Sequence, residues 1–419
     1  MKFQFLGGAG EIGRLGLQVQ TDRSRLLFDY GYSVDDPIKF PMFPSKIDAL
    51  FCSHAHLDHF GLAPMIHRVQ PESKLYATHM TNEISKILLY DSIKVFEMNR
   101  EPQLYTKTDV DRMNRSCNIL RYGQTKTLHN LEIEVLNAGH VPGAAMFHVR
   151  GPGTNFLFTG DMNLQESNLT RGAAIPKHPV ETLFIEGTYG NRHQPPREQV
   201  VQLMNEKIDE AISNKGKVII PAFAFGRSQD LLMELVRGHQ IYFDGLSNRI
   251  LGCFLEQGRE IIPRFEHLEQ AAKRCVRVTT PKLRLRAMNE AQIIITTGGM
   301  LDGGPVISYL KQLWNDPRSK IFLSGYQGEG TNGERLEQHR QLILDGKLCQ
   351  VACEVVDTKQ SAHSDLGSLL TFVEKVQPRN LVIMHSEESE AFRQHLLDRF
   401  PTLNVIVPTI GTSYTLDGS

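Results

Sequence analysis

The sequence predicts an α/β fold, and three observations point to this class. Short apolar runs that end in Gly-rich or polar turns indicate β-strands. Longer stretches with apolar residues at helical spacing lie between these runs, and such alternation is typical of α/β proteins. The composition, with 41% hydrophobic and 22% charged residues, is that of a folded globular chain rather than a disordered one.

The first part of the chain is rich in predicted strands. Helical spacing indicates helices within Thr81–Phe96, Glu198–Ser213 and Ser228–Arg237. The strands are expected at Lys2–Leu6, Arg25–Asp29, Asp48–Cys52, Leu131–Leu136, Asn155–Asp161 and Thr182–Glu186.

The length of 419 residues favours two domains, and the pattern suggests that one is inserted into the other. From about Pro195 to Gly346, buried strands separated by helices predict a second α/β unit. After it, strands are again expected, and we interpret them as the return of the first domain. The predicted domains are residues 1–194 joined with 347–419, and residues 195–346. Strands after residue 194 are expected at Lys217–Pro221, Gln292–Thr297, Lys320–Ser324, Gln350–Val356, Asn380–His385 and Leu403–Val407.

Charge and targeting signals narrow the class of protein. The formal net charge is −1, so a polyanionic substrate must be attracted by a local basic patch or by bound cations. The N-terminus does not resemble a signal peptide, and no run of 18 apolar residues occurs, so we expect a cytoplasmic protein that does not enter membranes. The six cysteines are scattered, which favours free thiols.

A cluster of histidines directly follows one predicted strand. The segment LFCSHAHLDHFGL places His54, His56, Asp58 and His59 on one tight loop. Imidazole nitrogens and carboxylate oxygens are ligands that zinc prefers. Because alternate residues of an extended segment project to one side, His54 and His56 can share one ion, and Asp58 and His59 then point to another. The cluster therefore predicts a two-zinc hydrolase.

Two further residues can complete such a site. His140 in NAGHVPGA lies on a Gly-rich turn after a strand, and Asp161 ends NFLFTGD in a similar position. A carboxylate there can bridge two ions that also activate a water molecule as the nucleophile. Taken alone, a residue such as His140 or Asp161 would more often be an ordinary turn residue, and Asp161 could equally cap a helix. Asp29, which ends LLFDYG, is expected either to orient a metal-bound imidazole or to form a turn.

Together these motifs resemble those of the metallo-β-lactamase superfamily. Asp29, the H-x-H-x-D-H cluster, His140 and Asp161 match its first four motifs in order, which implies an αββα sandwich with the site at one edge. The later segments LFIEGTYG, SAHSD and VIMHSE resemble motifs A, B and C of the β-CASP branch, and imply an inserted β-CASP α/β domain. PAFAFGRSQDLL, TTGGMLDGGP and SGYQGEGTNGERL extend the resemblance over nearly the whole chain, and the chain is most similar to short archaeal-type relatives of the cleavage and polyadenylation specificity factor nuclease.

The resemblance implies a role for each matching residue. His54, His56 and His140 would hold one Zn²⁺, while Asp58, His59 and His385 hold the second and Asp161 bridges the two. Asp58 would also orient or deprotonate the attacking water. Glu186 would hold a protonated His363, which then serves as general acid. Considered alone, SAHSD is more typical of a helix N-cap, with Ser361 or Ser364 as the capping residue.

Single-stranded RNA is the expected substrate for three reasons. The inserted domain would cover the zinc edge and leave a groove that a single strand can thread. A histidine at motif C, here His385, is the pattern of RNA-processing β-CASP enzymes, which the resemblance therefore implies. In addition, the segment KRCVRVTTPKLRLR, residues 273–286, carries six basic residues and no acidic one, and such a patch can neutralise backbone phosphates. A solvated helix or strand face is an equally good interpretation of this charge run.

The direction of cleavage is expected from the turn SGYQGEG. It resembles the loop that holds a 5′-monophosphate in ribonuclease J, so Ser324, Tyr326 and Gln327 are predicted to bind substrate, together with Ser386 beside His385. We therefore predict a 5′-to-3′ exoribonuclease. The remainder, GTNGERL, is more similar to endonuclease-type relatives and leaves endonucleolytic cleavage open. The C-terminal VPTIGTSYTL resembles the tail through which short relatives form homodimers, whereas an ordinary terminal strand is the alternative.

Two other functions are compatible with parts of this pattern. A small-molecule metallo-hydrolase, such as a lactamase or thioesterase, would need the same metal ligands but not the motifs after Glu186. A non-catalytic scaffold of an RNA-processing complex would be expected to have lost ligands, and none of the expected ligands is missing here.

Overall fold

The computed structural model describes residues 1–33, 37–235 and 238–416. It divides the chain into two compact units. Unit 1 comprises Met1–His193 and His363–Ser419, and unit 2 comprises Gln194–Ala362. Each unit is described by itself.

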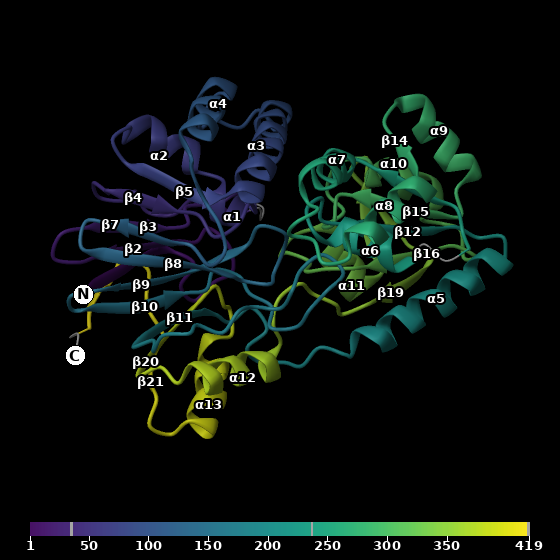
Figure 1. Ribbon diagram of the computed structural model, residues 1–419. Coiled ribbons are helices and arrows are strands. Elements are labelled where there is room, and N and C mark those ends of the chain that lie inside the picture. The colour runs from purple at the N-terminus through teal and green to yellow at the C-terminus, as the bar shows by residue number, and fades with distance from the viewer. Residues whose placement is uncertain (34–36, 236–237, 417–419) are drawn as a thin grey trace. The chain divides into compact units, whose positions relative to one another are not determined.

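Unit 1 is built on two seven-stranded sheets that pack face to face (Figure 1). Aromatic residues of both sheets fill the space between them: Phe28 and Phe51 of the first sheet contact Phe147 of the second. The first sheet has the order β22 (Ser413–Thr415), β1 (Lys2–Gly7), β2 (Gly16–Gln20), β3 (Arg25–Phe28), β4 (Ala49–Phe51), β5 (Lys74–Thr78) and β6 (Asn118–Leu120). The second has the order β21 (Asn404–Ile406), β20 (Asn380–Met384), β11 (Thr182–Glu186), β10 (Thr154–Phe158), β9 (Ala145–Gly151), β8 (Leu131–Asn137) and β7 (Thr125–Leu128).

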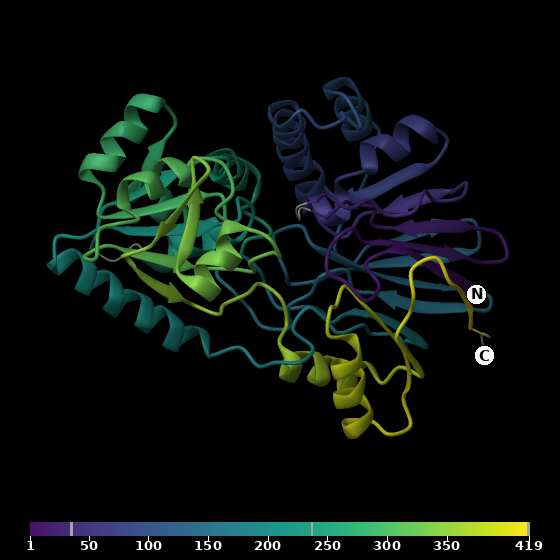
Figure 2. The ribbon, with the colours of Figure 1, turned by 180° about the vertical axis from the view of Figure 1, so that it is seen from behind.

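Helices cover the outer faces of this pair of sheets, as Figure 2 shows from the opposite side. On the first sheet, Leu27 and Leu50 pack with Ile66, Leu89 and Val110 of the covering helices. These helices are α2 (Ala63–Val69), α3 (His79–Asn99) and α4 (Lys107–Ser116), and the short α1 (Leu57–Phe60) precedes them. Two helices, α12 (Leu366–Val376) and α13 (Ser389–Arg399), accompany the second sheet. This arrangement is the αββα sandwich that the resemblance implied, and the predicted α/β fold is confirmed.

Strand direction in unit 1 brings polar residues from distant parts of the chain to the sheet edges. β3 and β4 are parallel, and so are β10, β11 and β20, so their carboxyl ends meet at one edge of each sheet. Asp29 follows β3, His54 follows β4 after a short turn, and Asp161 follows β10. Glu186 ends β11 and His385 follows β20.

Unit 2 is a second α/β unit with a six-stranded sheet whose described strand pairs are all parallel. Its central strands are buried throughout and mainly apolar, because helices cover both faces of a parallel sheet. The sheet order is β14 (Val276–Val278), β13 (Ile241–Asp244), β15 (Ile293–Thr297), β12 (Val218–Ala222), β16 (Lys320–Leu323) and β19 (Glu354–Asp357). The helices are α5 (Arg197–Ser213), α6 (Arg227–Leu235), α7 (Ser247–Gln257), α8 (Phe265–Arg274), α9 (Pro281–Glu290), α10 (Val306–Leu313) and α11 (Asn332–His339), and β17 (Gln341–Leu344) pairs with β18 (Lys347–Gln350).

The second boundary of the inserted unit lies later than the sequence pattern indicated. We expected the first domain to resume at residue 347, but β19 pairs in parallel with β16 and completes the sheet of unit 2. The compact unit therefore ends at Ala362 rather than at residue 346. A short apolar run cannot show which sheet it joins, because that depends on a pairing partner far away in the chain. The predicted helix Ser228–Arg237 corresponds to α6, and its last two residues lie outside the described residues.

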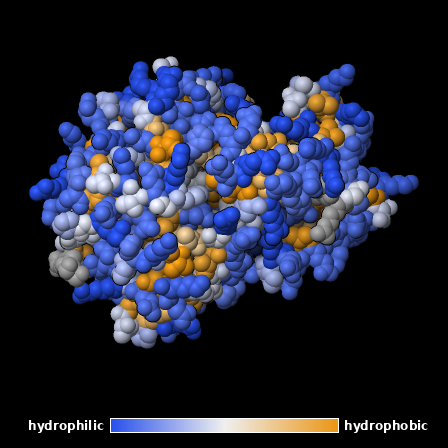
Figure 3. Space-filling view, in the orientation of Figure 1, coloured by the Kyte–Doolittle hydropathy of each residue, from blue (hydrophilic) through white to orange (hydrophobic). Residues whose placement is uncertain are grey.

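The surface is mainly polar on the face that Figure 3 shows, and hydrophobic residues form small separate patches there. Among residues 1–33, 37–235 and 238–416, no helix is both long enough and apolar enough to span a bilayer.

Candidate metal centre

The histidine loop begins where β4 ends and leads into the single turn of α1. The backbone N–H groups of His59 and Phe60 both donate to the carbonyl of His56, which closes this turn. Asp58 and His59 therefore lie on helical backbone, whereas His54 and His56 precede it. Local conformation thus separates the four side chains into two pairs.

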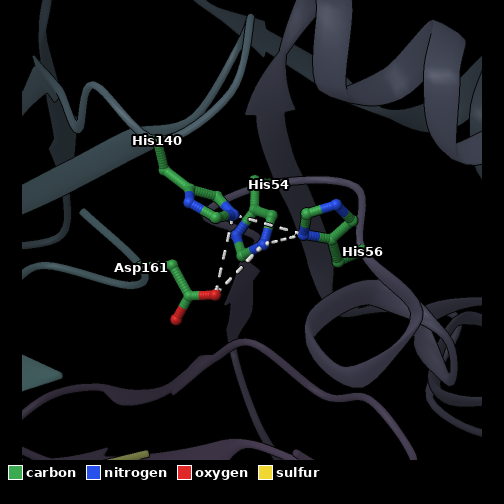
Figure 4. A group of neighbouring side chains, drawn as sticks. All are labelled: His54, His56, His140 and Asp161. Atoms are coloured by element: carbon green, nitrogen blue, oxygen red, sulfur yellow. Dashed lines mark hydrogen bonds and ion pairs between the residues drawn. The ribbon is translucent and has the colours of Figure 1, made fainter. Parts of the chain in front are cut away.

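The first group of ligands contains His54, His56, His140 and Asp161. Figure 4 shows the three imidazoles turned toward one another beside the carboxylate of Asp161. His56 Nδ1 lies 2.9 Å from His54 Nε2 and 3.3 Å from His140 Nε2. Asp161 Oδ2 lies 3.6 Å from His54 Nε2 and 3.8 Å from His140 Nε2. In a tetrahedral zinc site with bonds of roughly 2.0–2.1 Å, ligand atoms lie about 3.3 Å apart, so these donors can share one ion.

The second group contains Asp58, His59 and His385, and Asp161 lies beside it as well. Asp58 Oδ2 is 3.6 Å from His59 Nε2 and 3.2 Å from His385 Nε2. Asp161 Oδ2 is 3.2 Å from His59 Nε2, and its Oδ1 is 3.5 Å from His385 Nδ1. Because Asp161 adjoins both groups, its carboxylate is placed where it can bridge two ions.

Unpartnered buried atoms provide the test of whether a metal fits. Nε2 of His59 and Oδ1 of Asp161 are buried without a hydrogen-bond partner among the described residues. Buried polar atoms are rarely left in this state unless an ion or another group completes them. Burial also lowers the pKa of His54 and of His56, which keeps both imidazoles in the neutral form that binds cations. The donor set therefore suits a divalent metal of the kind that imidazole and carboxylate hold.

Asp29 lies directly beneath the histidine loop and is fully buried. Its Oδ2 is 2.7 Å from His59 Nδ1, and its two oxygens accept hydrogen bonds of 2.6 Å from the backbone N–H and the hydroxyl of Ser53. A carboxylate on Nδ1 directs the Nε2 atom of the same ring toward a metal. The backbone of Asp29 has a φ of 55°, a conformation that non-glycine residues adopt uncommonly and that clusters at functional sites.

Glu186 and His363 form a separate pair beside the ligands. Glu186 is fully buried, and its two carboxylate oxygens lie 3.0 and 2.9 Å from His363 Nδ1. The backbone N–H of Met162 donates to the same carboxylate over 2.7 Å. Burial alone would lower the pKa of His363, but the carboxylates of Glu186 and Asp161 raise this pKa to about 9. The centroid of the His363 ring lies 4.5 Å from that of the His140 ring.

Comparison with protein families places three known domains on the chain. Residues 18–185 match the Metallo-beta-lactamase superfamily domain, residues 227–336 match the Beta-Casp domain, and residues 349–408 match the Zn-dependent metallo-hydrolase RNA specificity domain. A curated protein of Methanocaldococcus jannaschii named "Probable RNase MJ4" is 31% identical, with 93% of this chain and 94% of that protein covered. This chain belongs to the β-CASP branch of the metallo-β-lactamase superfamily. It is a metal-dependent hydrolase.

Other relatives of this β-CASP protein cover almost the same length. "RNase J-like protein" of M. jannaschii is 31% identical over 98% of each chain, and "RNase aCSPSF2" of Saccharolobus solfataricus is 30% identical over 99% of this chain and 85% of that protein. The crystal structure of a protein of unknown function from Enterococcus faecalis V583 covers 99% of both chains with a TM-score of 0.64. At 15% identity that last similarity shows the fold alone.

Two side chains of the β-CASP centre were not singled out from the sequence. The hydroxyl of Thr188 lies 3.1 Å from His385 Nδ1 and also donates to the His385 carbonyl over 3.3 Å. The hydroxyl of Ser53 donates to Asp29, and its Oγ lies 3.0 Å from His54 Nδ1. The sequence indicates these two residues only by their positions, Thr188 two residues after Glu186 and Ser53 directly before His54. A hydroxyl in a loop can bind many kinds of partner, so the sequence does not show which group each one contacts.

The SAHSD segment caps a helix, although not through the serines that the alternative named. Asp365 is the N-cap of α12 and accepts a hydrogen bond of 2.9 Å from the backbone N–H of Ser368. Ser364 instead accepts from the backbone N–H of Leu164 over 2.9 Å. The cap and the His363 contact therefore coexist, because different residues of the segment make them.

The four predicted substrate-binding residues lie in different settings. In unit 2, Ser324 is buried and its hydroxyl donates to the Pro221 carbonyl over 2.5 Å, while Tyr326 and Gln327 are partly exposed. In unit 1, Ser386 is fully buried and its hydroxyl has no hydrogen-bond partner among the described residues. Ser324 and Ser386 thus have no exposed hydroxyl for a substrate, whereas Tyr326 and Gln327 are partly accessible to one.

Half of the basic segment 273–286 is engaged within unit 2. Arg284 pairs with Asp244, Arg286 pairs with Glu290, and Arg277 donates to Asn248. Lys273, Arg274 and Lys282 have no ion pair or hydrogen bond within the described part of the chain. The segment is therefore a smaller cationic surface than its composition suggested.

Proposed function

We propose that this protein is a two-zinc ribonuclease that hydrolyses phosphodiester bonds of single-stranded RNA. The observation that carries the proposal is the position of Asp161, between the ligand group of His54 and that of His59, with the Glu186–His363 pair beside it. A metal-binding pair next to a carboxylate-held imidazole supplies both parts that phosphodiester hydrolysis needs, a water activator and a proton donor.

The proposed ligand sets follow the two groups in the structure. One Zn²⁺ would be held by His54, His56 and His140. The other would be held by Asp58, His59 and His385, and Asp161 would contribute to both sites. When bound, the two cations lower the pKa of a water molecule and neutralise charge on the phosphate oxygens.

The protein's own side chains would move the protons. Hydrolysis joins the oxygen of water to phosphorus and breaks the bond from phosphorus to the departing ester oxygen. Asp58, whose carboxylate is partly exposed, would accept the proton of the water. His363, held through Nδ1 by Glu186, would donate a proton to the departing oxygen from its other nitrogen. Glu186 acts by orienting the ring and stabilising its protonated form.

RNA is the proposed substrate because of the family to which the C-terminal part belongs. Residues 349–408 match a domain named for RNA specificity, and three relatives that match over most of their length carry RNase in their names. The unpaired Lys273, Arg274 and Lys282 offer phosphate contacts in unit 2. A small-molecule hydrolase would require neither feature.

We further propose a 5′-to-3′ exonuclease, with endonucleolytic cleavage as the alternative. This direction rests on the resemblance of SGYQGEG to a 5′-monophosphate loop and on the partial exposure of Tyr326 and Gln327. The test compares single-stranded RNAs that begin with a triphosphate, a monophosphate or a hydroxyl group and carry an internal label. Mononucleotide release that prefers the monophosphate supports the exonuclease, whereas internal fragments that are independent of the 5′ end support the endonuclease. No cleavage of any RNA would reject both.

A homodimer is part of the same proposal. The C-terminal strand β22 pairs with β1, and Tyr414 stacks on Phe3 at a centroid distance of 5.1 Å. β22 is the outermost strand of its sheet, so its other edge is available for pairing with a second copy. Light scattering of the full chain coupled to size exclusion would distinguish a dimer from a monomer.

A further inference from the structure

An arginine that lies over a ring neighbouring the proposed proton donor has no role in the proposed hydrolysis. Arg192 is exposed, and its guanidinium carbon lies 4.4 Å from the centroid of the Tyr189 ring. The Tyr189 ring lies 6.0 Å, between centroids, from the ring of His363. The three side chains thus form a series that leads from the surface to the metal ligands.

The backbone holds this series in place. Tyr189 forms a parallel β-bridge with Asp365, and the backbone N–H of Leu366 donates to the Arg192 carbonyl over 3.0 Å. Both contacts join the segment after Glu186 to the start of α12, and His363 lies two residues before Asp365. The residues that form these two contacts all belong to unit 1.

The charge of Arg192 is available to a ligand. Within the described residues it forms no ion pair, and its guanidinium is supported only by the face of Tyr189. Arg14, another arginine of unit 1 near the histidine loop, differs because Glu11 holds it through two contacts, of 2.7 and 3.0 Å. Asp365, which forms the β-bridge with Tyr189, pairs with His193 over 3.4 Å. An unneutralised guanidinium stacked on an aromatic ring is well suited to bind a phosphate.

We propose that Arg192, supported by Tyr189, binds the RNA phosphate next to the scissile one on the side of the departing nucleotide. The inference rests on the proposed function, since the departing oxygen is the one that His363 would protonate. The Tyr189 ring neighbours His363, and Arg192 lies over that ring, so we place Arg192 along the part of the strand whose departing oxygen meets His363. Arg192 is then a substrate-binding residue, and Tyr189 is a positioning residue that acts through it.

The test measures binding separately from cleavage. A His363→Phe background removes the proposed proton donor but keeps a ring beside Tyr189, so the RNA stays intact during fluorescence anisotropy with a labelled single-stranded RNA. Arg192→Gln in this background is expected to weaken binding about 5–10-fold and to reduce the salt slope by about 0.7, the value for one phosphate contact on a single strand. Arg23→Gln is the matched control, because Arg23 is exposed before β3, at the end of that strand opposite Asp29.

Neutral linkages identify the phosphate itself. A single methylphosphonate at the linkage next to the scissile one, on the departing side, should weaken binding to the His363→Phe protein by the same factor as Arg192→Gln. Combined with Arg192→Gln it should cause no further loss, since both changes remove one contact. Arg192→Lys keeps the charge and should retain the salt slope. Tyr189→Phe should bind RNA like the parent, whereas Tyr189→Leu should lower RNA affinity about 2–5-fold because it removes the ring under the guanidinium.

Three outcomes would overturn the inference. In the first, Arg192→Gln binds RNA within twofold of the His363→Phe parent with an unchanged salt slope. In the second, the effects of the methylphosphonate and of Arg192→Gln multiply at every linkage. In the third, the His363→Phe parent does not bind RNA at all. The first two, found while the unmodified protein cleaves RNA, reject the role of Arg192 alone. Absence of cleavage by the unmodified protein, with the binding results as expected, rejects the proposed hydrolysis instead. Thermal melting of each variant verifies that it is folded.

Discussion

Both units of the molecule bury a carboxylate beside basic groups, but the two clusters are completed differently. In unit 2, Asp244 is fully buried and accepts two hydrogen bonds from Arg284, of 2.6 and 3.0 Å, and one of 2.7 Å from the Tyr309 hydroxyl. In unit 1, Asp161 is equally enclosed, yet its Oδ1 and the adjacent His59 Nε2 lack hydrogen-bond partners among the described residues.

This difference separates a structural cluster from a functional one. Asp244 has its cation within the protein, so the cluster needs nothing else and stabilises the fold. Asp161 faces the imidazoles of both ligand groups, and its Oδ1 has no hydrogen-bond partner among the described residues, so a bound cation would satisfy this oxygen. The comparison predicts that changes in unit 2 affect stability, whereas changes in unit 1 affect metal content and cleavage.

The largest effect is expected from removal of the bridging carboxylate. Asp161→Ala should abolish RNA cleavage and lower the metal content, because both ligand groups lose a shared oxygen. Metal analysis of the purified variant and cleavage of labelled RNA measure the two effects. Full metal content with normal cleavage would show that Asp161 is not the shared ligand.

Removal of the proposed proton donor should lower cleavage while the metal remains. His363→Ala is expected to reduce the cleavage rate by about 10²–10⁴-fold, the usual contribution of a general acid. Its metal content should equal that of the unmodified protein, since the ring is held by Glu186 and lies 3.9 Å from the nearest oxygen of Asp161. An unchanged rate would remove His363 from the proposed chemistry, and a loss of metal would make it a ligand.

A change in the unit 2 cluster should affect stability instead. Arg284→Met leaves the fully buried carboxylate of Asp244 without its cation and should lower the free energy of unfolding by about 3–5 kcal/mol. Urea denaturation measures the loss, and the metal content of the folded variant should be unchanged. Arg286→Gln is the matched control, because Arg286 pairs with Glu290 at an exposed position and should have no measurable effect. Loss of metal from folded Arg284→Met would contradict the division of roles between the two clusters.

The smallest effect is expected from the carboxylate behind the ligands. Asp29→Asn keeps the shape of the side chain but weakens its contact with His59 Nδ1, and should lower metal affinity about 10–100-fold. Competition with a coloured chelator measures this affinity. Ser53→Ala removes only the hydroxyl contact to Asp29 and should have a smaller effect. An affinity equal to that of the unmodified protein in Asp29→Asn would assign Asp29 to the fold alone.

Much of the site was predictable because its residues occur in motifs at strand ends. The cluster from His54 to His59 is contiguous, and Asp29, Asp161 and His385 each follow a run that the apolar pattern identifies as a strand. Parallel strands align such ends, so a correct strand prediction already places these residues near one edge. The resemblance to the β-CASP branch then related His363 to Glu186, and these two residues do lie in contact.

The remaining features were not predictable because they depend on which distant residue supplies a partner. Arg284 and Arg286 are as basic in sequence as Lys273 and Arg274, but Asp244 and Glu290 neutralise them. The hydroxyl of Ser324 was expected to meet a phosphate and instead donates to the carbonyl of Pro221.

The sequence alone predicted the fold class from its periodicity, and its motifs, through their resemblance to a known superfamily, predicted the residues of the candidate metal centre, because periodicity and motifs are local properties of the chain. Only the tertiary structure decided that β19 belongs to unit 2, and that Arg192 lies over Tyr189, the neighbour of His363, without an ion pair among the described residues. These facts depend on strand pairing and on charge neutralisation between residues far apart in the chain. Such distances in space are set by packing and cannot be read from the order of the residues.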